Sequence, residues 1–214
     1  MKIVIKIGGS MTFNEEGPII SYLNKLIPVL RQIKHKNQLI VSIGGGKYGR
    51  KYIKNLKGHL SNNEIELVFI DLLKSNVRLL SFLLDMKPIF SLNELKSSTN
   101  GVIGGLVPGH STDWGAAMSA KKIKADLFIK LTNVPYIYDK DPNKYKGAKP
   151  MKTMPFSELH KIKTETSPGH YGVLDPAAID IIAKNKIKTI IMSGKNPRNL
   201  LEAIKGKRIG TVIC

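Results

Sequence analysis

Three glycine clusters, each following a strand-like run, constrain the fold of this chain more than any other sequence feature. The runs begin at residues 2, 39 and 102, and the glycines follow at 8–9, 44–46 and 104–105. The run over 39–43 has no polar face, which is typical of a strand buried in a parallel sheet. Because the carboxyl ends of parallel strands share one edge, where ligands bind, the clusters predict an α/β protein with a binding site at that edge.

Strand-like and helical segments alternate along most of the chain. Strands are predicted at residues 2–7, 39–43, 87–90, 102–105, 126–131, 189–192 and 211–213. Helices are predicted at residues 19–33, 47–57, 61–84, 112–124, 156–163, 176–185 and 197–205. Residues 133–149 indicate a hairpin with an extended loop, and residues 164–172 form a loop of the length typical of lids. The alternation predicts a mainly parallel central sheet.

Length and composition limit the remaining possibilities. With 214 residues, 42% of them hydrophobic, the chain can form one large domain or two fused lobes around a sizeable core. Its single cysteine, Cys214, excludes a disulfide framework and a cysteine-based zinc site. No apolar run reaches the ~18 residues that span a membrane. The N-terminus lacks the features of a signal peptide, so we expect a cytoplasmic protein.

The chain carries a formal net charge of +18, which raises the question of a nucleic-acid partner. The lysines are spread over nearly every segment, and no block of five or six basic residues occurs. No aromatic-rich RNA-binding signature lies among them. The distribution therefore favours a solvated lysine surface first and an anionic small-molecule ligand second, and it argues against a nucleic-acid surface.

Glycine turns at a sheet edge are suited to binding phosphate. They let the backbone approach an anion closely, so that free N–H groups and helix dipoles stabilise its charge. Lys6 lies just before the first turn, and Lys47 and Arg50 follow the second. No Walker A motif and no dinucleotide-binding Gly-x-Gly-x-x-Gly occurs, so a phosphotransferase of this sequence is of another type. The alternative is that the turns are tight connections with nothing bound.

Several motifs, taken in order, resemble one known family. They are Lys6-Ile-Gly-Gly-Ser10, the Gly44-Gly-Gly-Lys-Tyr-Gly-Arg-Lys-Tyr52 block, Pro108-Gly-His-Ser-Thr-Asp113, Leu131-Thr-Asn-Val134 with Tyr138-Asp-Lys-Asp-Pro142, and Val173-Leu-Asp-Pro-Ala-Ala178. Together they resemble the amino acid kinase superfamily, and within it the archaeal-type uridylate (UMP) kinases. The resemblance covers essentially the whole chain.

The resemblance implies a three-layer αβα sandwich in which ATP and UMP lie end to end across the sheet edge. Residues 1–214 would form one domain, with the acceptor bound by about 1–125 and ATP by about 126–214. Contacts to ATP are implied for Gly9, Ser10, Gly46, Arg50, Thr132, Asn133, Tyr138 and Asp141. Contacts to UMP are implied for Gly45, Glu66, Pro108, Gly109, His110, Ser111, Thr112 and Asp113. A homo-oligomer is also implied, with a hexamer as the assembly.

The expected catalytic residues are Lys6 and Asp175. Lys6 would neutralise charge on the moving phosphoryl group, and Asp175 would orient lysines or simply cap the helix that follows it. No base is needed, since a UMP phosphate oxygen is already an anionic nucleophile. Mg²⁺ would be held mainly by the phosphates of ATP, and no metal site of the protein's own is predicted.

This chain departs from the family pattern at several places. Lys6 stands where many archaeal members have Asp, although bacterial uridylate kinases have Lys there. Glu66 replaces the usual Asp for the ribose hydroxyls, and Pro135-Tyr136 replaces Asp-Gly after the Thr-Asn-Val motif. Arg50 stands where isopentenyl phosphate kinases place a phosphate-binding His, which argues against that substrate.

The leading hypothesis is thus ATP-dependent phosphorylation of UMP to UDP. A second hypothesis keeps the same fold but assigns another small phosphate or carboxylate acceptor, because of the changes at Glu66 and Pro135-Tyr136. A third hypothesis, from a different class, is a basic binding protein without catalytic activity.

Overall fold

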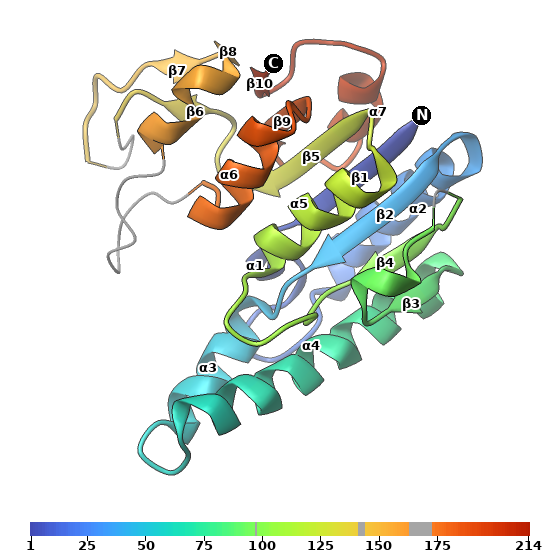
Figure 1. The fold of residues 1–214 in the computed structure, drawn as a ribbon, viewed down its shortest axis with the longest axis vertical. Helices are drawn as coiled ribbons and strands as arrows, with labels where there is room; N and C mark the ends of the chain where they lie inside the picture. The colour runs from blue at the N-terminus through green and yellow to red at the C-terminus, as the bar shows by residue number, and fades with distance from the viewer. Residues whose placement is uncertain (97, 141–143, 163–172) are drawn as a thin grey trace.

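The computed structural model describes residues 1–96, 98–140, 144–162 and 173–214. An eight-stranded sheet runs through it in the order β3-β4-β2-β1-β5-β9-β10-β8 (Figure 1). Its strands are β1 (Lys2–Ile7), β2 (Gln38–Ile43), β3 (Lys87–Ile89), β4 (Gly101–Ile103), β5 (Leu127–Thr132), β8 (Thr153–Met154), β9 (Thr189–Ser193) and β10 (Thr211–Ile213). Of the described strand pairs within this sheet, only β9 with β10 is antiparallel. The predicted mainly parallel sheet is confirmed.

Helices cover both faces of the sheet and complete the predicted three-layer αβα sandwich. One face carries α2 (Ile20–Lys36), α4 (Asn62–Leu84) and α7 (Asn199–Ile204), and the other carries α5 (Thr112–Ile123) and α6 (Pro176–Lys184). Side chains of β1 divide between the two layers, since Ile3 and Ile5 join the core under α2, whereas Val4 joins the core under α5. This alternation is the period of a strand buried on both faces.

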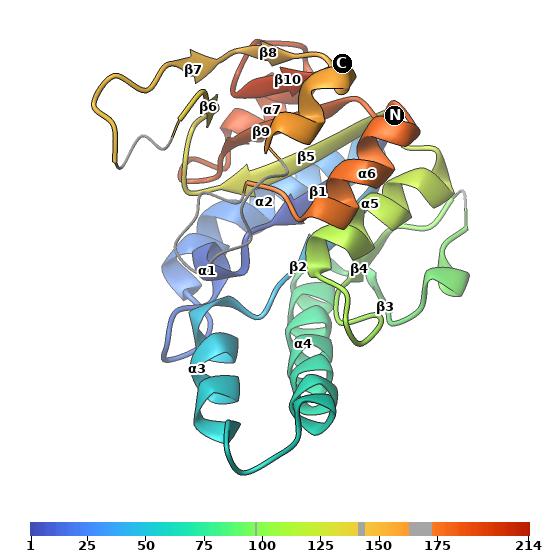
Figure 2. The same ribbon diagram turned by 60° about the vertical axis from the view of Figure 1, so that its left-hand side comes forward.

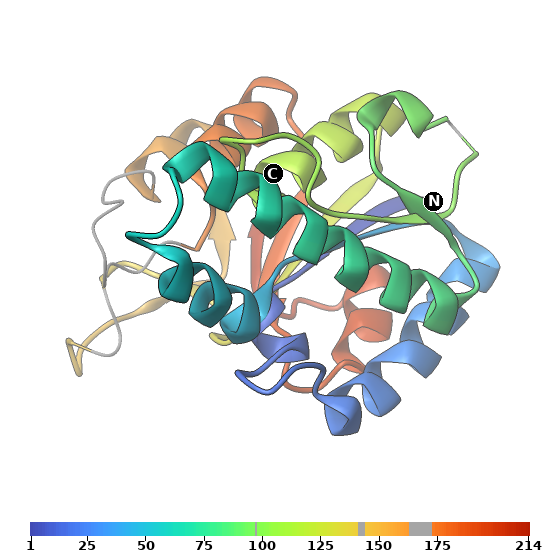
Figure 3. The same cartoon turned by 90° about the horizontal axis from the view of Figure 1, so that it is seen from below.

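A helical pair extends beyond the sheet. The N-terminal part of α4 lies beside α3 (Gly46–Leu56), and the two project away from the strands (Figures 2 and 3). The capping box predicted for α4 is present, because Ser61 accepts a hydrogen bond from the Glu64 N–H and the Glu64 carboxylate accepts one from the Ser61 N–H. The cap fixes where α4 begins, and with it one wall of the site described below.

Some segments differ from the prediction. The residues after β1 form a short helix, α1 (Gly9–Thr12), rather than a plain turn. Residues 156–162 are a 3₁₀-helix, η2 (Phe156–Ile162), and a further 3₁₀-turn, η1 (Leu92–Glu94), was not predicted. The hairpin is confirmed by the antiparallel pair β6 (Ile137–Tyr138) and β7 (Pro150–Met151).

The loop predicted at residues 164–172 lies outside the described residues. Among the helices of the described segments, none has the length and apolar character needed to cross a bilayer.

Candidate active site

The glycine turns surround one cavity at the carboxyl ends of β1, β2 and β4. Its volume is about 550 Å³, within the range of small-molecule sites. Most of the predicted acceptor residues and several predicted ATP residues line it: Lys6, Gly9, Gly45, Gly46, Arg50, Glu66, Pro108, Gly109, His110, Ser111 and Thr112. Part of its wall is apolar, formed by Ile53, Phe69, Ile70 and Leu73. The cavity therefore combines backbone donors and cations with a surface on which a flat ring could lie.

Two of the glycine turns touch each other through their backbones. A Cβ atom placed on Gly9 would lie 2.4 Å from the backbone N of Gly46, closer than any real contact of that kind. Gly46 itself has φ +68°, a conformation that glycine adopts without the usual steric cost. The first turn can thus lie against the second only because both lack side chains, and the backbone N of Gly46 lies close to Gly9.

The loop after β4 closes the opposite side of the cavity. Gly109, with φ +74°, donates its N–H to Oε2 of Glu66 on α4 at 3.0 Å. The Glu66 side chain, predicted to meet the ribose hydroxyls, therefore reaches the rim of the cavity and holds the loop there. Its contact with ribose stays a prediction.

Residues at the start of α5 order the same loop. Ser111 caps the helix by accepting the Trp114 N–H at 3.0 Å. The His110 ring packs on the Trp114 indole, with 4.1 Å between ring centroids, and its Nδ1 lies 3.1 Å from the Pro108 carbonyl oxygen. Trp114 thus packs against the loop, and His110 and Ser111 are among the residues that line the cavity.

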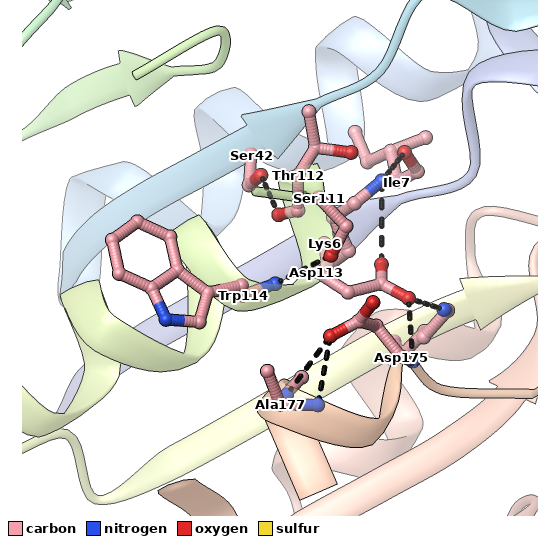
Figure 4. A network of polar contacts seen from close by, with 11 residues as sticks. Lys6, Ile7, Ser42, Ser111, Thr112, Asp113, Trp114, Asp175 and Ala177 are labelled. Atoms are coloured by element: carbon pink, nitrogen blue, oxygen red, sulfur yellow. Dashed lines mark hydrogen bonds and ion pairs between the residues drawn. The ribbon is translucent and has the colours of Figure 1, made fainter. Parts of the chain in front are cut away.

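A buried ionic cluster lies at the base of the cavity. Asp113 on α5 has Oδ1 3.7 Å from the Lys6 ammonium, and its Oδ2 accepts a hydrogen bond from Lys130 on β5 (Figure 4). The backbone N–H of Asp175 also donates to Oδ2, at 3.3 Å. One carboxylate thus holds two lysines and the start of α6 together.

The electrostatics of the cluster favour a charged Asp113 and a readily titrated Lys6. Burial tends to raise the pKa of Asp113, but the charges of Lys130 and Lys6 and the hydrogen bonds outweigh it and hold that pKa below its usual range. For Lys6, burial dominates and lowers the pKa to about 8, with Asp113 opposing and Lys130 reinforcing the shift.

Asp113 and Asp175 make different contacts at this place. Within the described chain, the carboxylate that lies against the lysines is that of Asp113, which had been expected to meet UMP. The Asp175 carboxylate instead caps α6, accepting the N–H groups of Ala177 and Ala178 at 2.9 and 3.2 Å. The helix-cap alternative therefore describes Oδ1 of Asp175, and its expected role in orienting lysines stays a prediction.

Lys130 was not identified from the sequence. Its only sequence signal is its place in the predicted strand at 126–131, one of many lysines in the chain. Lys130 is the register partner of Lys6 in the pairing of β1 with β5. Its place beside Lys6 could have been recognised only if that pairing had been known.

Four of the remaining predicted ATP residues are not among those that line this cavity. Ser10 is in α1, Thr132 ends β5, Asn133 follows it, and Tyr138 is in β6. The Thr132 hydroxyl donates to the Val134 carbonyl at 2.8 Å and accepts the Val134 N–H at 3.1 Å, which shapes the turn where Pro135 follows. Asp141 lies outside the described residues.

A three-layer α/β sandwich with glycine turns and a buried lysine facing one cavity defines a class of protein that handles phosphorylated ligands without a Walker A loop. The sequence model of the amino acid kinase family matches residues 1–99 and 67–193. This chain belongs to the amino acid kinase family.

Within this family, the chain is similar to uridylate kinases over its whole length. The chain is 37% identical to the uridylate kinase of Sulfurisphaera tokodaii, covering 100% of this chain and 99% of that one. It is 34% identical to the uridylate kinase of Thermococcus kodakarensis with the same coverage. The crystal structure of uridylate kinase from Archaeoglobus fulgidus superimposes with a TM-score of 0.88 at 33% identity, over 100% of both chains. A UMP kinase structure from Bacillus anthracis, at 16% identity and a TM-score of 0.82, has the same fold.

Proposed function

We propose that this protein is a UMP kinase, which transfers the γ-phosphoryl group of ATP to UMP and releases UDP and ADP. One observation carries the proposal: two glycine turns and a buried lysine line the same cavity, and the turns lie in contact because they have no side chains. Full-length similarity to archaeal uridylate kinases supports UMP as the acceptor.

The geometry suits phosphoryl transfer because this reaction needs placement and charge neutralisation more than covalent chemistry. The UMP phosphate would occupy the cavity between Gly45 and the 108–112 loop, and Arg50, expected to contact ATP, lines the same cavity. The N–H groups of Gly9 and Gly46 and the ammonium of Lys6 would meet the transferred group. ATP would extend from there toward Thr132, Asn133 and Tyr138, which remain proposed contacts.

Mg²⁺ is expected to arrive with ATP. The described segments contain no group of three or more side chains of the kind that ligate metals. Asp113, the acidic residue nearest the lysines, is occupied by them. These residues therefore fit a metal held by phosphate oxygens, which neutralises phosphate charge when bound.

Three wider features belong to the same proposal. The acceptor would be bound by about residues 1–125 and ATP by about residues 126–214, within one domain. The protein would act in the cytoplasm and would assemble as a homo-oligomer, as the family resemblance implies.

The proposal predicts that purified protein with MgATP makes UDP from UMP faster than it phosphorylates other small acceptors. Lys6→Met should lower kcat on the order of 10²–10³-fold, since one well-placed donor to a charged transition state contributes about that much. The measurement is UDP and ADP formation by chromatography.

Lys121→Met, which removes an exposed lysine of α5, is the matched control and should keep full activity. If the protein phosphorylates another acceptor but not UMP, the assignment of UMP as the substrate is wrong and the assignment as a kinase stands. No turnover of any acceptor, together with salt-sensitive binding of nucleic acid, would favour a binding protein instead.

A further inference from the structure

A row of polar residues crosses the sheet beneath α5 and α6. The register of β1 places Lys6 opposite Ser42 on β2 and opposite Lys130 on β5. Partners in register on neighbouring strands have their side chains on the same face. Both lysines are buried, with 3% of Lys6 and 9% of Lys130 exposed. Lysines are almost never buried this far without a partner, so the pair needs a structural explanation.

The two lysines share one carboxylate unequally. Lys130 makes the close hydrogen bond to Oδ2 of Asp113, whereas Lys6 lies 3.7 Å from Oδ1. The short hydrogen bond of the Lys6 ammonium goes instead to the Ile7 carbonyl oxygen, at 2.8 Å. Lys6 lines the cavity, and Lys130 is not among the residues that do. One lysine is thus committed to Asp113, while the other has donor capacity left toward the cavity.

We propose that Lys130 is a positioning residue for phosphoryl transfer, which occupies Asp113 so that the Lys6 ammonium stays available to the phosphate groups. The proposal rests on the proposed kinase function, because it assigns Lys130 a role in that reaction. Without Lys130, the carboxylate would have Lys6 as its single cationic partner in the cluster and would draw it into a close ion pair, away from the cavity.

Lys130 also influences how Lys6 titrates. Among the described residues, the charged groups near Lys6 include Asp113 from α5 and Lys130 from β5, with Arg50 of α3 and Glu66 of α4 on the walls of the same cavity. From α6, the Asp175 backbone N–H reaches Asp113. Burial lowers the pKa of Lys6 most, and the charge of Lys130 lowers it further, while Asp113 raises it. Removing the charge of Lys130 therefore raises that pKa, because burial is unchanged and Asp113 is then the one of the two adjacent charged groups that still acts on Lys6.

The experiment compares kcat/KM for UMP against pH in the wild type and in Lys130→Met, since this ratio reports ionisations of the free enzyme. The wild type should lose activity as pH rises through about 8, where Lys6 loses its proton. In Lys130→Met the alkaline limb should move upward by about 1 pH unit. At pH 7 its kcat should fall about 10-fold, less than for loss of the Lys6 donor itself.

Three variants make the comparison specific. Lys130→Gln keeps an N–H donor toward Asp113 without the charge, so it should fold even if the methionine variant does not, and it should show the same upward shift. Lys130→Arg keeps the charge and should leave the limb near its wild-type position. Lys121→Met, on the exposed side of α5, should leave the whole profile unchanged.

A second readout separates this inference from the kinase proposal. The Lys6 Nζ resonance can be titrated by NMR in nucleotide-free protein labelled with ¹⁵N-lysine, and assigned with Lys6→Arg. Absence of UDP formation by the wild type would remove the kinase proposal, while an upward shift of the Lys6 titration in Lys130→Gln would still support the coupling. The inference would be overturned if the Lys130→Met and Lys130→Gln variants kept the wild-type alkaline limb of the pH profile and the wild-type titration of Lys6.

Discussion

At the scale of one residue, the site depends on the absence of a side chain at Gly9. A side chain there would collide with the backbone of Gly46 rather than with a movable side chain. Backbone cannot move aside without displacing the turn that carries Gly45 and Arg50. The two turns therefore form one unit, and the absence of Cβ atoms is what brings their N–H groups together.

Gly9→Ala should therefore damage both stability and catalysis. Forcing a methyl group into a close-packed place costs about 1–3 kcal/mol, and we expect a loss of kcat of at least about 100-fold as the donors are displaced. Thermal unfolding and UDP formation measure the two effects.

Gly147→Ala is the matched control, since a Cβ there has no atom within 4 Å. It should behave as wild type. A Gly9→Ala protein with normal stability and normal kcat would mean that the two turns are not in contact in solution.

At the scale of elements, the start of α4 holds one wall of the cavity. The capping box of Ser61 and Glu64 satisfies N–H groups that would otherwise lack partners at the first turn. The hydrogen bonds from Ser61 also hold the pKa of the Glu64 carboxyl below its usual value. Glu66, which anchors Gly109, lies two residues further along the same helix.

Ser61→Ala removes the cap and should lower the free energy of unfolding by about 1 kcal/mol. For a domain of this size that corresponds to a fall in Tm of about 2–4 °C. Because Glu66 lies in the turn that the cap stabilises, we also expect a modest rise in KM for UMP with little change in kcat. Calorimetry and steady-state kinetics provide the measurements.

Ser61→Asp, which preserves an acceptor at the cap, should restore both values. A Ser61→Ala protein whose Tm equals that of the wild type would show that packing of α4 alone fixes its first turn.

At the scale of the whole molecule, α4 also exposes large apolar side chains. Phe82 is 76% exposed and Leu67 is 56% exposed, whereas Val77, Leu80 and Leu84 of the same helix are buried in the core. Apolar groups left at a surface favour association, at roughly 1.5–3 kcal/mol for each large side chain that becomes buried. This exposure is consistent with the expected homo-oligomer.

Phe82→Asp should therefore shift the protein to a smaller assembly. The measurement is the molar mass by light scattering coupled to size-exclusion chromatography. Tyr145→Asp removes a similarly exposed aromatic ring outside α4, 54% exposed, and should leave the mass unchanged. A wild-type protein that is monomeric at all concentrations would contradict the expected oligomer.

The proposed halves are parts of one sheet. β1 of the first half pairs with β5 of the second, and the Asp126 N–H donates to the Lys2 carbonyl oxygen at 2.9 Å. The division near residue 125 thus separates regions with different proposed ligands and does not separate two cores, since both hydrophobic clusters draw on residues from each side.

Local patterns predicted the order of most strands and helices and the edge at which the glycine turns gather, because apolar runs, the glycines at their ends and the cap at Ser61 are all short-range features. Most individual residues that line the cavity were expected from the family resemblance rather than from these patterns. The antiparallel placement of β10 beside β9 was not predicted, because pairing direction depends on contacts between distant segments.

Only the tertiary structure decided which carboxylate meets the lysines. Lys6, Asp113 and Lys130 lie on three separate elements, and no local pattern relates them. The register of β1 with β5 places the two ammonium groups side by side, and the docking of α5 on that face puts Asp113 between them. A buried charge requires an opposite charge within a few ångströms, and only the folded packing determines which one that is.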